Sequence, residues 1–356
     1  MEPFEAQNNR QIRTGDRIAY WDIAKAVAIF CVVWGHCLQN MTSDTNYWLT
    51  DTLCKIIYSF HMPLFMIISG YFAYSSLFKP ITKTIKKKII QLLVPSVAWY
   101  LVISGFAMIF HREFNIGRFT DIASALPYSL WFLKSLFMCY LITLVGVGLY
   151  RWRRWSIAVY AIMIFGVGEW LNYVSTISML PFFIAGILLH THKEYLCKKS
   201  VIGIGGILLI FISMLILWES SDYNMYMNPF YHNWGGYKAM IIRCLIGLSG
   251  ICVVLYGVSL LERYNARSLN AYLQKIGSMT LGIYCIQVII AEGLLKHSSG
   301  YIEQIDLLKS SEFKYVVYNY IITPIASILT IWICVAIIKL LKKNRFTRLI
   351  FLGEQQ

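Results

Sequence analysis

The chain of 356 residues is 58% hydrophobic and only 14% charged, and its mean hydropathy is +0.57. This composition excludes an ordinary soluble globule and is typical of a polytopic membrane protein. The net charge of +14 could suggest nucleic-acid binding. However, the lysines and arginines fall in short clusters at the ends of apolar runs, so we expect a lipid bilayer and no nucleic acid as partner.

About ten apolar runs are long enough to cross a membrane, because a spanning helix needs about 20 such residues. We therefore predict an all-α fold with about ten transmembrane helices in one domain. This domain covers 18–341, between tails at 1–17 and 342–356. The expected spans are 18–40, 52–78, 88–110, 128–150, 155–172, 174–190, 200–218, 237–261, 271–295 and 314–341.

Basic residues are distributed unevenly between the polar segments that join these spans. Most of them lie in the N-terminal tail, in the C-terminal tail and in the segments on the same side of the membrane. Cytoplasmic segments carry such an excess of lysine and arginine. The pattern predicts that both termini are cytoplasmic.

The first span carries an acid, a base and an imidazole, namely Asp22, Lys25 and His36. At helical spacing the three share one face, and His36 lies about 16 Å further along the axis than Lys25. Such groups are costly in lipid, so this face must look into protein or a water-filled cavity. His36 is the candidate general base, or a histidine that only bonds a neighbouring helix. Lys25 could meet an anionic ligand, or merely pair with Asp22.

Further candidates lie in the following segments. His61 opens the second span at about the level of His36, where it could orient that imidazole, contact substrate or serve only to start the helix. Lys86, Lys87 and Lys88 could hold phosphate groups, although membrane topology alone explains such a cluster. Trp131 and Arg243 are candidate substrate contacts. The cysteines show no paired metal-binding spacing, so we expect no metal.

Several of these segments together resemble a known family. They are Asp22-Ile-Ala-Lys25, Val32-Val33-Trp34-Gly35-His36, Phe60-His61-Met62-Pro63-Leu64-Phe65, Ser69-Gly70-Tyr71, Leu180-Pro181-Phe182-Phe183 with Gly186, and Gly277-Ser278. They resemble the membrane-bound acyltransferase family 3, and in particular its fucose 4-O-acetylase-like branch.

The resemblance implies a multi-pass enzyme of the bacterial cytoplasmic (inner) membrane. Such an enzyme takes an acetyl or other acyl group from acyl-CoA, a co-substrate rather than a permanently bound cofactor. It places that group on a sugar hydroxyl of a cell-surface glycan or of its lipid-linked precursor. His36 matches the family's essential histidine.

The chain departs from the family pattern at three places. Lys25 stands where most members have arginine, and Lys88 and Gln91 stand in place of paired arginines ahead of the third span. Gln287 replaces a histidine, and an amide cannot take up a proton. His36 could act as a base or form an acyl-histidine. A glycan or small-anion transporter or flippase is the alternative function, because intramembrane charges suit that class as well.

Overall fold

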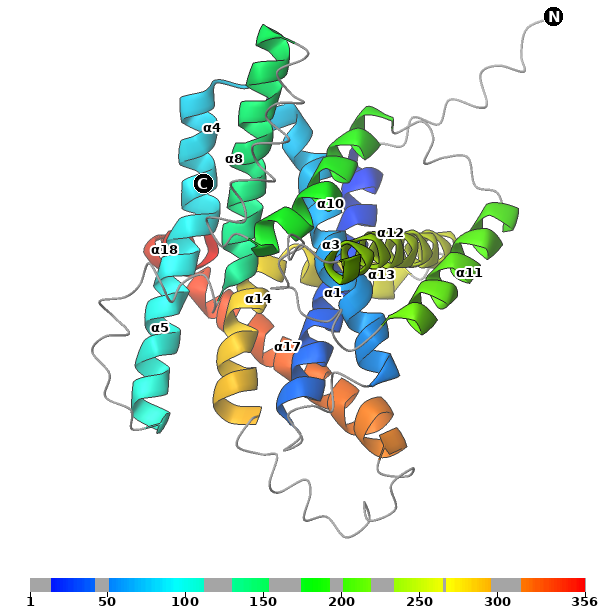
Figure 1. Cartoon of the computed structure of the whole chain (residues 1–356). Coiled ribbons are helices and arrows are strands. Elements are labelled where there is room, and N and C mark those ends of the chain that lie inside the picture. Colours follow the sequence, from blue (N-terminus) through cyan, green and yellow to red (C-terminus); the bar gives the residue numbers. More distant parts are fainter. Residues whose placement is uncertain are drawn as a thin grey trace, which may run out of the picture.

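The computed structural model describes residues 14–41, 51–111, 130–153, 174–192, 201–218, 234–264, 267–295 and 315–355. Every element in these ranges is helical (Figure 1). The elements are α1 (Thr14–Asn40), α3 (Thr52–Ala73), η1 (Tyr74–Ser76), α4 (Ile81–Lys88), η2 (Ile89–Leu93), α5 (Val94–His111), α8 (Trp131–Trp152), α10 (Val174–Thr191), α11 (Val201–Leu217), α12 (Trp234–Arg263), α13 (Arg267–Gly277), α14 (Thr280–Val288), η5 (Ile289–Leu295), η7 (Tyr318–Ile322), α17 (Thr323–Leu341) and α18 (Arg345–Leu352).

Six helices in the described ranges are long and apolar enough to cross a membrane. Residues 267–277 and 280–295 form a pair bent by 65°, which makes a seventh if the pair is one span. The helices at 176–191 and 204–217 are apolar but shorter, and the expected span at 155–172 lies outside the described residues. The predicted all-α, multi-pass fold is confirmed, while the count of ten and the orientation of the termini stay predictions.

Helix α1 lies at the centre of the helical assembly. It packs against α3, α12, α13, α14 and α17, and it runs antiparallel to α3 (Figure 1). Apolar side chains such as Ile23, Ile29 and Leu38 are completely buried. A helix that is buried on almost all sides can hold polar groups away from lipid, so α1 is suited to carry a site.

Two glycines allow α3 and α10 to cross in very close contact. A Cβ atom at Gly70 would collide with the backbone carbonyl of Phe183, and one at Gly186 would collide with that of Ile67. Small residues at a crossing let two backbones approach, which is how membrane helices gain packing contacts. The Ser69-Gly70-Tyr71 and Phe183-to-Gly186 segments are therefore two sides of one contact.

Polar contacts join α1 to η7 and to α17. Trp34 Nε1 donates to Thr323 Oγ1 at 2.9 Å, and the hydroxyl of Tyr318 donates to the carbonyl oxygen of Leu38 at 2.9 Å. Buried polar groups of this kind need partners, and here each helix supplies one for the other. The contacts fix the segment that carries His36.

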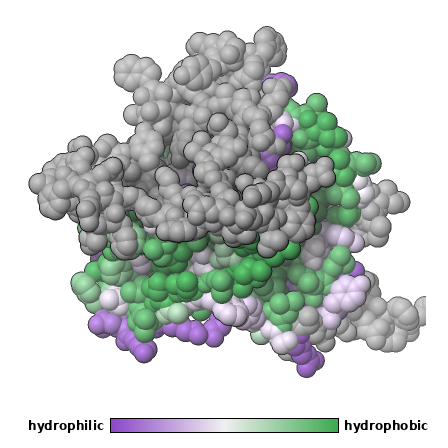
Figure 2. All heavy atoms as spheres, turned by 90° about the horizontal axis from the view of Figure 1, so that it is seen from below, coloured by the Kyte–Doolittle hydropathy of each residue, from purple (hydrophilic) through white to green (hydrophobic). Residues whose placement is uncertain are grey.

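The outer faces of several helices are apolar. Large side chains stand exposed on α11, α12 and α17, among them Ile216, Ile241 and Trp332. In Figure 2, hydrophobic residues cover most of the described part of one face, and hydrophilic residues gather toward its edge. An apolar exterior of this extent fits a protein surrounded by lipid.

Candidate active site

Asp22 and Lys25 form an ion pair at one end of α1. Lys25 Nζ lies 2.6 Å from Asp22 Oδ1, and the two side chains are 24% and 18% exposed, respectively. Of the two interpretations of Lys25, the structure supports pairing with Asp22. A single anionic group approaching Lys25 would therefore compete with a neighbouring carboxylate.

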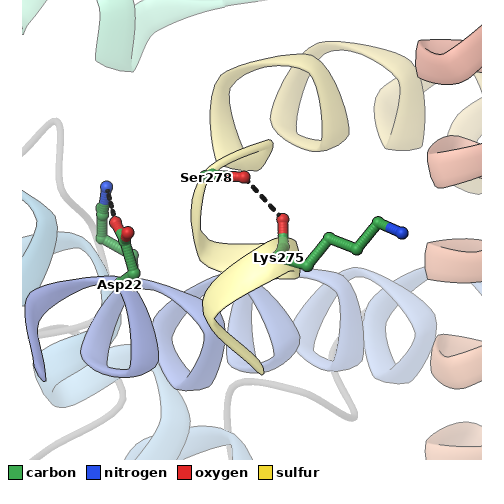
Figure 3. A network of polar contacts seen from close by, with 4 residues as sticks. Asp22, Lys275 and Ser278 are labelled. Atoms are coloured by element: carbon green, nitrogen blue, oxygen red, sulfur yellow. Dashed lines mark hydrogen bonds and ion pairs between the residues drawn. The ribbon is translucent and has the colours of Figure 1, made fainter. Parts of the chain in front are cut away.

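The turn between α13 and α14 contacts the backbone of α1 at Asp22. A Cβ atom at Gly277 would collide with the backbone carbonyl of Asp22, so this contact requires glycine. Figure 3 shows the turn beside Asp22, with the side chain of Lys275 directed away from that carboxylate. Ser278 Oγ donates to the carbonyl oxygen of Lys275 at 2.8 Å, which fixes the turn (Figure 3). The Gly277-Ser278 segment thus belongs to the surroundings of Lys25.

Apolar residues fill the face of α1 between Lys25 and His36. Ile29 and Val32 follow Lys25 at helical spacing, and they are 0% and 2% exposed. The face therefore looks into protein, as its charged residues require. The ion pair and the imidazole stand at opposite ends of a closed apolar stretch.

His36 is half-buried at the other end of that stretch. Its backbone carbonyl accepts a hydrogen bond from Asn40 Nδ2 at 2.9 Å. Among the described residues, none forms a hydrogen bond with its imidazole, so both ring nitrogens are available to substrate. Next to it, a Cβ atom at Gly35 would lie 2.9 Å from the ring of Tyr58. Gly35 thus lets α3 approach the backbone at His36 closely.

His61 and Arg243 lie in the same region as His36. His36 and Arg243 are both close enough to His61 for electrostatic interaction with its ring. His61 is 4% exposed, and its Nδ1 lies 2.6 Å from the carbonyl oxygen of Ile57. Since a carbonyl only accepts, Nδ1 carries the proton and Nε2 is left as an acceptor. The structure thus brings together three predicted site residues from α1, α3 and α12.

The predicted phosphate-binding lysines differ in their surroundings. Lys86 and Lys87 are exposed on α4, whereas Lys88 is half-buried with its Nζ 5.2 Å from the centre of the Tyr140 ring. No acidic side chain in the described part of the chain pairs with Lys88. Lys88 is therefore the member of the cluster best placed to bind an anion.

A cavity of about 470 Å³ lies one helical turn beyond Lys88. It is lined by Gln91, Leu92, Ser278, Met279, Leu281, Gly282, Ile338, Leu352, Gly353, Glu354 and Gln355. Two positions named in the sequence comparison meet here, because Gln91 and Ser278 both line the cavity. The cavity is large enough for part of a small-molecule ligand.

Trp131 is the first residue of α8, where it is half-buried against Phe132. Phe132 also contacts Phe65 of α3 and Tyr284 of α14, with ring centres 5.9 and 5.8 Å apart. This aromatic group joins the predicted segment that contains Phe65 to α8 and α14. Among the described residues, Trp131 makes no ring contact or hydrogen bond with His36, and its role in substrate binding stays a prediction.

Asp51 was missed by the sequence reasoning, although it supports the site. It is 5% exposed, caps α3 by accepting from the backbone N–H of Cys54 at 2.7 Å, and accepts from Asn319 Nδ2 at 2.9 Å. An Asp directly before an apolar helical run is a recognisable cap signal. Its partner, 268 residues away, could not be found from local pattern.

These features define a helical membrane protein with a half-buried imidazole and an ion-paired lysine on one helix, and with a cavity lined by the turn after α13. Residues 18–339 match the acyltransferase domain of the acyltransferase 3 family. The chain belongs to this family, and the expected enzyme class, a membrane acyltransferase, is thereby confirmed. Assignment to the fucose 4-O-acetylase-like branch stays a prediction.

Two curated relatives are similar to part of the chain. Nodulation protein NolL of Sinorhizobium fredii is 31% identical over 187 residues, which are 51% of this chain and 49% of that protein. Nodulation protein NolL of Mesorhizobium japonicum is 31% identical over 156 residues, or 42% of each chain. The matches thus span about half the length of these relatives or less. No solved structure matches the chain significantly.

Proposed function

We propose that the protein is an integral membrane O-acyltransferase that moves an acetyl group from acetyl-CoA to a sugar hydroxyl of a cell-surface glycan or its lipid-linked precursor. One observation carries this proposal. In a chain of the acyltransferase 3 family, Lys25 and His36 share a protein-facing side of α1, and His36 has an imidazole that no described residue engages.

On this proposal the donor binds at the Lys25 end of α1. The anionic donor approaches Lys88 and the cavity beside Gln91, and its flexible arm carries the thioester toward His36. The acceptor hydroxyl comes from the other end, near His61 and Arg243. If donor and acceptor approach from opposite ends, α1 needs a polar group at each end. Lys25 and His36, about 16 Å apart along the helix, meet this need.

The chemical step needs a base at the acceptor hydroxyl. His36 takes the hydroxyl proton while the oxygen attacks the thioester carbonyl, and the carbon–sulfur bond then breaks. The coenzyme leaves as a thiolate, and His36 donates the proton to it. The imidazole is then neutral again. A cationic side chain such as Arg243 would stabilise negative charge that develops on the carbonyl oxygen.

A two-step version uses the same residue as nucleophile. The imidazole of His36 attacks the thioester and releases the thiol, and the acceptor hydroxyl then displaces the acyl group from the ring. Thiol release in the absence of acceptor distinguishes the two versions. One equivalent released per protein indicates acyl-histidine, whereas no rapid phase indicates direct transfer.

The experiment is thiol release from acetyl-CoA by purified protein in nanodiscs, with an extract of lipid-linked glycans as acceptor. His36→Ala should abolish release while the protein remains folded, and His192→Ala, at an exposed histidine, should leave it unchanged. Lys25→Ala should weaken donor binding. Near wild-type turnover of His36→Ala would refute the mechanism. Glycan transport by folded protein without thiol release would favour the transporter alternative.

A further inference from the structure

The C-terminal segment Arg345–Gln355 completes one wall of the cavity. It lies outside residues 18–339, which match the family domain, yet Leu352, Gly353, Glu354 and Gln355 all line the cavity. The opposite walls come from η2 and from the turn after α13. A segment beyond the matched domain therefore contributes to the space beside Gln91.

Specific contacts hold this segment in place. Trp99 Nε1 donates to the carbonyl oxygen of Phe351 at 2.8 Å, and the two rings pack edge to face with centres 5.2 Å apart. Gly353 ends α18 with a φ of 64°, and a Cβ atom there would lie 2.7 Å from the carbonyl oxygen of Gln91. Glycine is thus needed for both the turn and the close approach.

The segment also brings the carboxylate of Glu354 to the cavity. Glu354 lines it and pairs with Lys342, with Oε1 and Nζ 2.7 Å apart. The side chains are 40% and 36% exposed, so this ion pair is easily exchanged for another. Arg348 lies one turn before the cavity-lining Leu352, and its buried Nε has no hydrogen-bond partner among the described residues.

We propose that this segment forms a phosphate subsite for the acyl donor. In this subsite Glu354 forms an ion pair with Lys342 until the donor binds. A donor phosphate displaces the Glu354 carboxylate, pairs with Lys342 and accepts from the guanidinium of Arg348. The unsatisfied Nε then gains a partner. The inference rests on the proposed use of acyl-CoA as donor.

Substitutions of Glu354 and of Lys342, the two partners of this ion pair, should then have opposite effects on donor binding. Glu354→Gln removes the competing carboxylate and should lower the Kd of acetyl-CoA about two- to fivefold. Lys342→Gln removes the phosphate partner and should raise it by a similar factor. Lys343→Gln makes the same charge change at an exposed neighbour and should have a smaller effect.

S-acetylpantetheine, which has no phosphate groups, is the matched probe. All three variants should bind it as the wild type does, which separates a phosphate contact from a general effect on folding. Equal changes for both probes, or weaker acetyl-CoA binding by both Glu354→Gln and Lys342→Gln, would overturn the subsite. If folded wild-type protein bound neither probe, the proposed function itself would fail.

Discussion

The crossing of α3 and α10 allows a quantitative test of the packing. Gly70→Ala or Gly186→Ala would each place a methyl group against the backbone of the other helix. Overpacking costs about 1–3 kcal/mol, while alanine is favoured over glycine within a helix by about 0.5–1 kcal/mol. A backbone carbonyl cannot rotate away as a side chain can. We therefore expect each substitution to destabilise the protein by up to about 2.5 kcal/mol.

The double substitution should cost much less than the sum of the single ones. Both methyl groups would press on the same crossing, so the helix separation that accommodates one also accommodates the other. The free energy of unfolding can be measured by titration of folded protein in mixed micelles with a denaturing detergent. Gly105→Ala and Gly148→Ala are the controls, because a Cβ atom at either position would have no neighbour within 4 Å.

Two results would refute this reasoning. If Gly70→Ala and Gly186→Ala had the same effect as the controls, the helices would not be in backbone contact there. If the two costs were additive, the glycines would not act on a single crossing. Either result would also weaken the placement of His61, which lies on the same helix.

Three further predictions concern α1 and the lysines of α4. Gly277→Ala should push the turn after α13 away from α1, lowering stability by about 1–2 kcal/mol and weakening acetyl-CoA binding, as measured by calorimetry. Trp34→Phe should lose the hydrogen bond to Thr323 and about 0.5–1.5 kcal/mol of unfolding free energy in the same detergent titration. Lys88→Gln should raise the Kd of acetyl-CoA by at least about tenfold, whereas exposed Lys86→Gln should change it by less than about twofold; equal effects would contradict a specific role for Lys88.

Local patterns in the sequence were sufficient for the helices that hold the candidate site. Runs of apolar residues located α1 and α3 closely, and helical spacing placed Asp22, Lys25 and His36 on one face. These features depend on residues near one another in the chain, where hydrophobic periodicity is informative. The shared level of His36 and His61 follows from two antiparallel neighbours joined by a short connection.

Contacts between distant segments could not be predicted in the same way. The bend after Gly277, the return of the C-terminal segment onto Gln91 and the pairing of Asp51 with Asn319 depend on how helices pack. Such packing is determined by close approach and by the partners available to buried polar groups, which a single sequence does not specify. The short helix α10 also shows that apolar length alone does not give the number of spans.

The apolar stretch of Ile29 and Val32 has a consequence for the cell as well as for the site. A continuous watery passage between Lys25 and His36 would let protons and ions flow down their gradients. Ile29 and Val32 fill the middle of this helix face, so no such passage follows it among the described residues. On the proposed function, the arm of the donor would carry an acyl group past these side chains without an open path along which ions could discharge the membrane voltage.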